Sequence, residues 1–145
     1  MARSTEIVLE YSDFGAIGRE QARQIDKVCR DTAFTIEAKA KAAIMNPPKT
    51  GRYYKHGNVI HQASAPGEAP ATDTGNLVGS GYTKKMGDSD YETGFGNLVG
   101  SGYTAEYAAP LEFGTPRILP RPYLRPAVEA VRDQFVSAIR RIVEK

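Results

Sequence analysis

The fold follows first from residues 17–45, which read IGREQARQIDKVCRDTAFTIEAKAKAAIM. Apolar side chains recur in this stretch in steps of three and four, at Ile25, Val28/Cys29, Thr32/Ala33, Ile36, Ala40 and Ala43/Ile44. This spacing predicts a long amphipathic helix with one apolar face. We expect the helix to end at Asn46-Pro47-Pro48, because proline lacks an amide donor and restricts the residue before it.

A second helix is expected at the end of the chain. One continuous apolar stripe is formed there by Leu124, Val128, Val131, Phe135, Ala138/Ile139 and Ile142. Pro122 suits the first turn of this helix. Each of the two helices has a single apolar face and needs a surface to cover it, most simply a sheet.

Strands are expected in the remaining segments, at residues 6–11, 82–86, 90–95 and 103–113, with Gly87-Asp88 as a turn. Residues 51–55 and 59–62 flank His56-Gly57-Asn58, which is a hairpin signal. The chain is therefore predicted to be one α+β domain, residues 1–145, with both long helices packed on a small antiparallel sheet. An extended β-hairpin arm, about residues 47–72, is expected to protrude from it.

Composition excludes several classes of protein. No apolar stretch is long enough for a transmembrane helix, and the start of the chain lacks the apolar run of a signal peptide. One cysteine excludes an intrachain disulfide or a cysteine-cluster metal site. These features predict a protein made in the cytoplasm, without membrane contact. Leu, Ile, Val and Phe supply only 29 of 145 residues, so a partner surface that completes the burial is expected.

Charge is distributed unevenly along the chain. Residues 65–115 carry two basic and seven acidic groups, whereas residues 116–145 carry seven basic and three acidic groups. The acidic middle can pair with the basic tail inside one subunit, or with the tail of the next subunit. Solvated faces without a partner are the third interpretation.

The triplet Asp73-Thr74-Gly75 is the active-site motif of aspartic proteases, which need two carboxylates sharing one proton. No apolar strand leads into it here, and two long helices do not suit an all-β protease. Asp73 is instead predicted to cap a short helical turn. A dimeric aspartic protease that uses Asp73 stays as a remote alternative.

No other motif indicates catalysis, a cofactor or a metal. His56 and His61 flank the predicted turn but lack a third ligand for zinc. Cys29 lies on the apolar stripe of the first helix and is predicted to be a core residue. The glycines of residues 94–100 have the wrong spacing for a dinucleotide loop. We expect no enzyme activity.

The predicted arm carries a basic and aromatic run, Arg52, Tyr53, Tyr54, Lys55 and His56. Such residues bind nucleic acid through stacking and phosphate contacts. Tyrosine and arginine are also favoured anchors of protein interfaces. A protein interface is the preferred interpretation of this run, and a DNA-contacting module is the alternative.

One nonapeptide occurs twice. Residues 75–83, GNLVGSGYT, recur as residues 96–104. Two copies are too few for a solenoid, so a local duplication without functional meaning is expected. The two copies need not adopt the same structure.

A series of motifs carries a resemblance to a known family. They are residues 50–54 (TGRYY), 63–70 (ASAPGEAP), 73–77 (DTGNL), 107–108 (YA) with 112–115 (EFGT), and 121–127 (RPYLRPA). In this order and spacing the chain resembles the neck or tail-completion proteins of long-tailed double-stranded-DNA bacteriophages. The resemblance runs from the first helix to the C-terminus. The second nonapeptide departs from it, because family members usually carry a plain strand there.

The resemblance implies a structural virion protein at the head-tail junction, also called a head-tail connector or minor tail protein. It implies a ring, with about six subunits, that contacts adjacent neck and tail proteins and meets genomic DNA only incidentally in its lumen. Before assembly the protein would lie in the host cytoplasm. No catalysis and no cofactor are implied.

The resemblance motifs also contain residues with a predicted structural role. Asp73 and Gly75 belong to the triplet, and Glu112 and Gly114 precede a proline-rich turn that ends near Arg125. We expect Glu112 to form an ion pair with Arg125, which would hold the last predicted strand against the start of the C-terminal helix.

Overall fold

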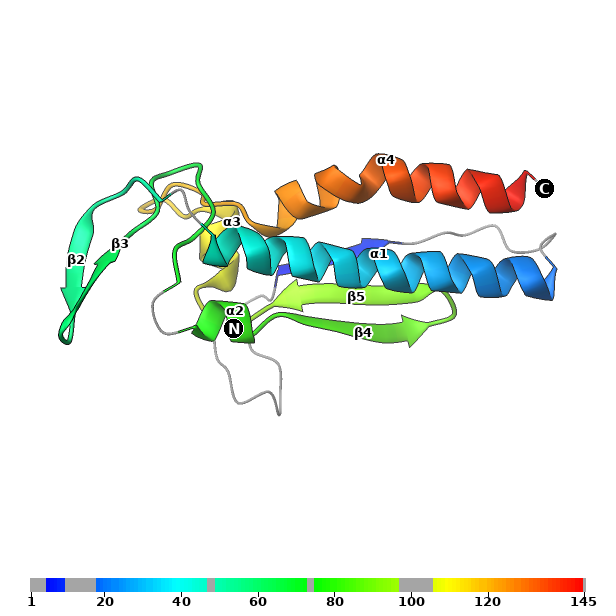
Figure 1. Ribbon diagram of the computed structural model, residues 1–145, viewed down its shortest axis with the longest axis horizontal. Coiled ribbons are helices and arrows are strands. Elements are labelled where there is room, and N and C mark those ends of the chain that lie inside the picture. The colour runs from blue at the N-terminus through cyan, green and yellow to red at the C-terminus, as the bar shows by residue number, and fades with distance from the viewer. Residues whose placement is uncertain (1–4, 10–17, 47–48, 73–74, 97–105, 145) are drawn as a thin grey trace.

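The structure is a computed structural model that describes residues 5–9, as backbone alone, and residues 18–46, 49–72, 75–96 and 106–144. Its elements are β1 (Thr5–Leu9), α1 (Arg19–Met45), β2 (Tyr53–His56), β3 (Val59–Gln62), α2 (Asn76–Gly79), β4 (Tyr82–Gly87), β5 (Asp90–Phe95), α3 (Ala108–Phe113) and α4 (Leu124–Val143). This is the predicted α+β class. Figure 1 shows an elongated body with the β2–β3 hairpin at one end. Among the described residues, no helix has the length and apolar character needed to span a membrane.

Helix α1 confirms the predicted stripe. Its buried residues are Ile25, Cys29, Ala33, Ile36, Ala40 and Ile44. The helix ends before Asn46, whose backbone N–H donates to the carbonyl oxygen of Ala42 at 2.9 Å. The two prolines that follow prevent continuation, as the sequence predicts.

Helix α4 runs beside α1 (Figure 1), and the two helices pack together. Its buried residues are Leu124, Ala127, Val131, Ile139 and Ile142. The helix begins at Leu124, so the expectation for Pro122 is wrong, because Pro122 precedes the helix. Pro126 lies in the first turn instead, where its missing N–H removes no intrahelical hydrogen bond.

The main sheet has three antiparallel strands in the order β1-β5-β4. Residues Thr5 to Leu9 pair with Phe95 to Tyr91, and Tyr82 pairs with Gly94. The central strand β5 is buried from Tyr91 to Phe95, because α1 packs against it. Strand β4 lies at the edge and exposes its residues from Lys84 onward.

The core has two parts. One contains Phe95 and Tyr123, whose rings meet edge to face at 5.1 Å between centroids. The Tyr123 hydroxyl donates to the carbonyl oxygen of Ala108 at 3.0 Å, so its polar end is satisfied inside the core. The other contains Tyr91 and residues of both long helices, including Cys29. Residues from α1, α4 and β5 contribute to both parts.

The predicted strand at residues 103–113 is wrong over its described part. Residues Ala108–Phe113 form helix α3. Pro110 lies in the first turn of this helix, and Gly114 follows it at φ +74°. Proline near the start and glycine after the end are typical of a helix, so the signal was present in the sequence.

Candidate interaction surface

The β2–β3 hairpin projects from the body as an arm (Figure 1). Its register pairs Tyr53 with Gln62, Tyr54 with His61, Lys55 with Ile60 and His56 with Val59. Every residue of β2 is exposed. A two-stranded hairpin is only marginally stable in water by itself, so this arm needs a surface to cover it.

The arm has two different faces, because successive side chains of a strand point to opposite sides. Tyr54, His56, Val59 and His61 share one face, which we call the aromatic face. There the Tyr54 and His61 rings stack at 5.6 Å between centroids, and the His56 ring lies 6.2 Å from that of His61. These rings therefore cover one another in part.

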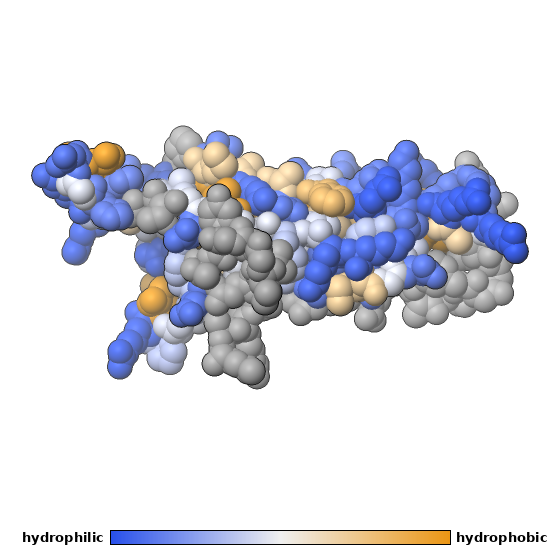
Figure 2. All heavy atoms as spheres, turned by 90° about the horizontal axis from the view of Figure 1, so that it is seen from below, coloured by the Kyte–Doolittle hydropathy of each residue, from blue (hydrophilic) through white to orange (hydrophobic). Residues whose placement is uncertain are grey.

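Tyr53, Lys55, Ile60 and Gln62 share the opposite side, which we call the open face. Tyr53 is 66% exposed and Ile60 is 71% exposed. Figure 2 shows hydrophobic atoms on the projecting hairpin. The predicted patch of residues 52–56 is thus divided between two faces, with Tyr53 and Lys55 on the side where apolar surface is most exposed.

The base of the arm is held by backbone contacts. The N–H of Gly51 donates to the carbonyl oxygen of Ala63 at 2.9 Å, and the N–H of Ala63 donates to that of Arg52 at 3.0 Å. A Cβ at Gly51 would lie 2.6 Å from the carbonyl oxygens of Ala63 and Ser64, so only glycine fits. The arm therefore leaves the body in a defined direction.

Glu68 adds a polar clamp below the arm. Its carboxylate accepts hydrogen bonds from the Thr50 hydroxyl, from the Thr50 N–H at 3.0 Å and from the Ala65 N–H at 2.8 Å. These donors, the hydroxyl first, lower the pKa of Glu68 to about 2. The connector that begins at residue 65 is thereby tied to the start of the arm.

A second group of exposed apolar side chains lies at the end of α3 and in the turn after it, and the sequence patterns do not predict it. Phe113, Ile118 and Leu119 are exposed around the turn closed by the N–H of Thr115 and the carbonyl oxygen of Ile118 at 2.8 Å. The turn is joined to the base of the arm, because the Gly67 N–H donates to the Pro120 carbonyl oxygen at 3.0 Å. In the sequence, the signal for this exposed group is three apolar residues that stand between prolines.

Cations outnumber carboxylates at this end of the molecule, where Glu106 is an exposed carboxylate just before α3. Within residues 49–72 and 107–122 the carboxylates are those of Glu68 and Glu112, and backbone amides occupy both. Arg52, Lys55 and Arg117 are exposed. Among the described residues, no acidic group of the middle segment forms an ion pair with the basic tail. Glu92, for example, binds Lys84 at 3.1 Å.

The predicted ion pair between Glu112 and Arg125 is wrong, although the two residues do meet. The buried Glu112 carboxylate accepts hydrogen bonds from the backbone amides of Tyr123, Leu124 and Arg125 at 2.9, 3.0 and 2.8 Å. The Arg125 guanidinium binds Glu129 at 3.3 Å instead. Glu112 therefore holds α3 to the start of α4 through the backbone, where a negative charge suits a helix N-terminus.

Asp73 and Thr74 lie outside the described residues, so neither the predicted cap nor the protease alternative is tested. Gly75 is the residue before α2 and has φ +78°. The first nonapeptide thus forms α2 and the start of β4. Of the second copy only Gly96 is described, at φ +138°, and its N–H donates to the Ser80 hydroxyl at 3.2 Å. The two equivalent glycines therefore differ in backbone conformation.

Within the described part of the chain, no cluster of three or more His, Cys, Asp or Glu residues is suited to a metal ion. Cys29 is buried in the core as predicted. Burial, with a smaller contribution from Asp26 and Asp90, raises the pKa of its thiol to about 11. This is the environment of a packing residue, since a reactive cysteine needs a lowered pKa.

No protein-family model, curated protein or solved structure matches this chain. The arm and the turn after α3 expose apolar side chains at one end of the molecule, and Phe34, Met45 and Met86 are exposed elsewhere in the described part of the chain.

Proposed function

We propose that this protein is a structural component of a bacteriophage neck, a tail-completion or head-tail connector subunit that assembles as a ring at the head-tail junction. The motif series between residues 50 and 127 supports the family. The observation that carries the proposal is the arm. Its Tyr53 and Ile60 side chains are 66% and 71% exposed. Exposed apolar surface of this kind does not stabilise a monomer, and it is typical of a surface that binds a partner.

The chemistry of the arm end favours a protein partner over DNA. Ile60, Val59, Phe113 and Leu119 are aliphatic or aromatic side chains without polar atoms, and all are exposed. Phosphate backbones are bound by cations and hydrogen-bond donors, so these side chains would gain nothing there. Arg52 and Lys55 then act as charged members of a protein interface, beside apolar anchors.

The test is the native mass of the purified chain over a concentration series, followed by electron microscopy of the assembled fraction. We expect a closed ring of about six subunits with a central opening. A species that stays monomeric, or stops at a symmetric dimer, over this series contradicts the ring. A shift of short duplex DNA that weakens steeply with salt, without a ring, would favour the DNA-contacting alternative.

A further inference from the structure

The arm segment, residues 49–69, leaves the body at the C-terminal end of α1 and returns to the same place (Figure 1). Its first residue contacts both sides of this root. The Lys49 ammonium donates to the carbonyl oxygen of Ala43 in α1 at 2.7 Å and to that of Ala69 at 2.8 Å. Lys49 therefore binds the end of the helix and the end of the arm segment at the same time.

The sequence explains why α1 needs this ammonium. The amide four residues after Ala43 would normally bind its carbonyl oxygen, but residue 47 is a proline, which has no N–H. The Lys49 ammonium supplies the missing donor, and a cation suits the negative end of a helix. Lys49 is half-buried, and burial lowers its pKa more than the nearby Glu68 raises it. The charge is thus held at this root at a cost in hydration.

Glu68 makes the reverse connection. Its carboxylate, at the return of the arm segment, accepts hydrogen bonds from the N–H and the hydroxyl of Thr50, at the start. A side chain of each end therefore binds the backbone of the other end, and we call Lys49 and Glu68 the double clamp. The return is also tied to the body, because the Arg121 guanidinium donates to the carbonyl oxygen of Ser64 at 3.3 Å.

We propose that the double clamp holds the arm in one direction relative to the body before any partner binds, so that the arm is a preformed docking element. A hairpin on a flexible root would sample many directions, and binding would have to select one of them at a cost in entropy. The clamp removes that cost in advance. The fixed direction follows from the contacts at the root alone, whereas its effect on assembly rests on the ring proposed above.

Double electron–electron resonance measures the direction of the arm. Spin labels are attached at Val59→Cys on the arm and at Ser137→Cys on α4, both exposed positions, while the buried Cys29 stays unlabelled. We expect this labelled chain to give one narrow distance distribution. Lys49→Met and Glu68→Ala remove opposite halves of the clamp, and each is expected to abolish the narrow distribution in favour of a broad one. If one variant fails to fold, the other decides.

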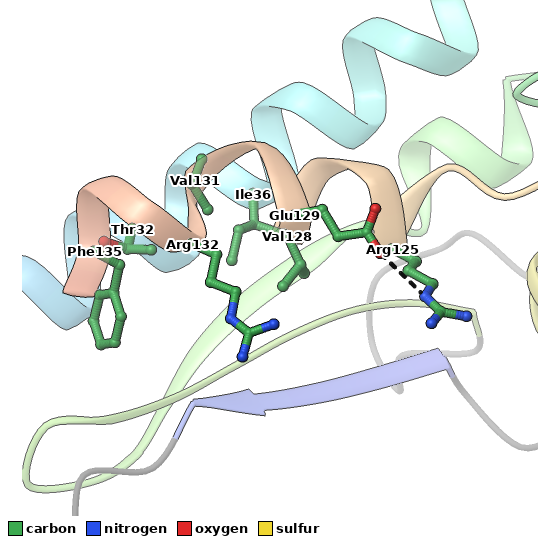
Figure 3. Close-up of a pocket in the computed structure, with 8 residues that line it drawn as sticks. All are labelled: Thr32, Ile36, Arg125, Val128, Glu129, Val131, Arg132 and Phe135. Carbon is green, nitrogen blue, oxygen red and sulfur yellow. Dashed lines mark ion pairs between the residues drawn. The ribbon is translucent and has the colours of Figure 1, made fainter. Parts of the chain in front are cut away.

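Two matched controls remove the same charges from other places. Lys55→Met removes an exposed lysine from the arm itself. Glu129→Ala removes a carboxylate that binds the Arg125 guanidinium at 3.3 Å on the surface of α4 (Figure 3). Both controls are expected to keep the narrow distribution. Equal broadening in the controls and the clamp variants, or a narrow distribution in the clamp variants, overturns the proposal.

Exchange of the two charges separates a clamp on the backbone from a simple ion pair. In the double variant Lys49→Glu, Glu68→Lys, opposite charges still lie near each other. The carbonyl oxygens of Ala43 and Ala69 have lost their donor, however, and the Thr50 N–H has lost its acceptor. We expect a broad distribution. A narrow one would mean that attraction between the two charges holds the arm, and it would overturn the clamp.

Assembly is measured separately, by sedimentation velocity. If the wild-type chain forms the ring, both clamp variants are expected to weaken it by about tenfold or more, because the arm must then be ordered on binding. Unchanged assembly in variants with a broad distribution overturns the link to assembly. If the wild-type chain forms no ring, the proposed function fails, and the distance distributions still decide whether the clamp holds the arm.

Discussion

Glu112 Oε1 lies 2.8 Å from the backbone nitrogen of Arg125, while the guanidinium of Arg125 turns away to Glu129. The carboxylate therefore acts on the helix start and not on a basic side chain. Backbone amides at the start of a helix have no intrahelical partner, so a buried acceptor there satisfies donors that water cannot reach. One residue of α3 thereby fixes the position of α4.

Loss of this carboxylate should be costly. Glu112→Ala removes the acceptor for three backbone amides, of which those of Tyr123 and Leu124 are buried. We expect the free energy of unfolding to fall by about 3–5 kcal/mol, because buried donors are left unsatisfied. Urea unfolding followed by circular dichroism measures this.

The control for that experiment is Glu129→Ala. Glu129 is exposed and forms a surface pair with Arg125. Its removal is expected to change the free energy of unfolding by less than about 1 kcal/mol. Similar losses in the two variants would show that the Glu112 contacts do not stabilise the fold.

Two glycines with positive φ should respond differently to alanine. Gly114 has φ +74°, and a Cβ there would lie 2.8 Å from Pro120 Cδ and 2.9 Å from the Ile118 carbonyl oxygen. Gly67 has φ +87° but no atom within 4 Å of its Cβ position. We expect Gly67→Ala to cost about 1 kcal/mol and Gly114→Ala clearly more, about 3 kcal/mol. Thermal unfolding of both variants measures these losses of stability. Equal losses would contradict the crowding at Gly114.

The clamp below the arm should respond to acid. Hydrogen bonds from Thr50 and Ala65 lower the pKa of Glu68 to about 2, from its ordinary value of 4.5. A lowered folded-state pKa means that the clamp is fully present above pH 4.5 and is lost as the pH falls through about 2. The amide resonances of Thr50 and Ala65 should therefore move near pH 2 in an NMR titration. Movement near pH 4.5, or the same titration in Glu68→Gln, would show that the clamp does not form.

The thiol of Cys29 should be unreactive in the folded protein. It is buried, and its pKa is raised to about 11, so almost no thiolate exists at pH 8. Ellman's reagent is expected to label Cys29 only after unfolding in urea, at one thiol per chain. Rapid labelling of the native protein would mean that this part of the core is open.

Much of the secondary structure was predictable because it follows local patterns. The apolar steps from Ile25 to Ile44 define α1, and the adjacent prolines 47 and 48 end it. Gly57-Asn58 between two short strands defines the arm, with Gly57 at φ +61°. These signals depend on neighbours within a few residues, so no knowledge of tertiary contacts is needed to recognise them.

Helix α3 carries end signals in Pro110 and Gly114 but no periodic signal, for a physical reason. Its six residues are too few to display a 3.6-residue period, and a helix so short is not stable by itself. It exists because the Tyr123 hydroxyl binds the Ala108 carbonyl oxygen and because Glu112 binds the start of α4. Both contacts join residues that are more than ten positions apart.

The sequence predicts which residue types make up the interaction surface. Only the fold shows which of these residues share a face. Residues 52–56 were recognised as a basic, aromatic arm, but pairing with β3 places Tyr53 and Lys55 opposite to Tyr54 and His56. Strand alternation fixes this division only once the register is known. The apolar turn at Ile118 and Leu119 carries no periodic signal, and its position beside the base of the arm comes from the Gly67–Pro120 contact.

By itself, the sequence determined the two long helices, the hairpin and the α+β class, because hydrophobic periodicity and proline act over a turn or two of chain. Tertiary structure decided that Glu112 binds backbone amides and not the Arg125 side chain, and that Tyr53 and Ile60 share an uncovered face. Those outcomes depend on which polar groups burial removes from water and on which side chains share one face of the hairpin. Both are properties of the assembled fold.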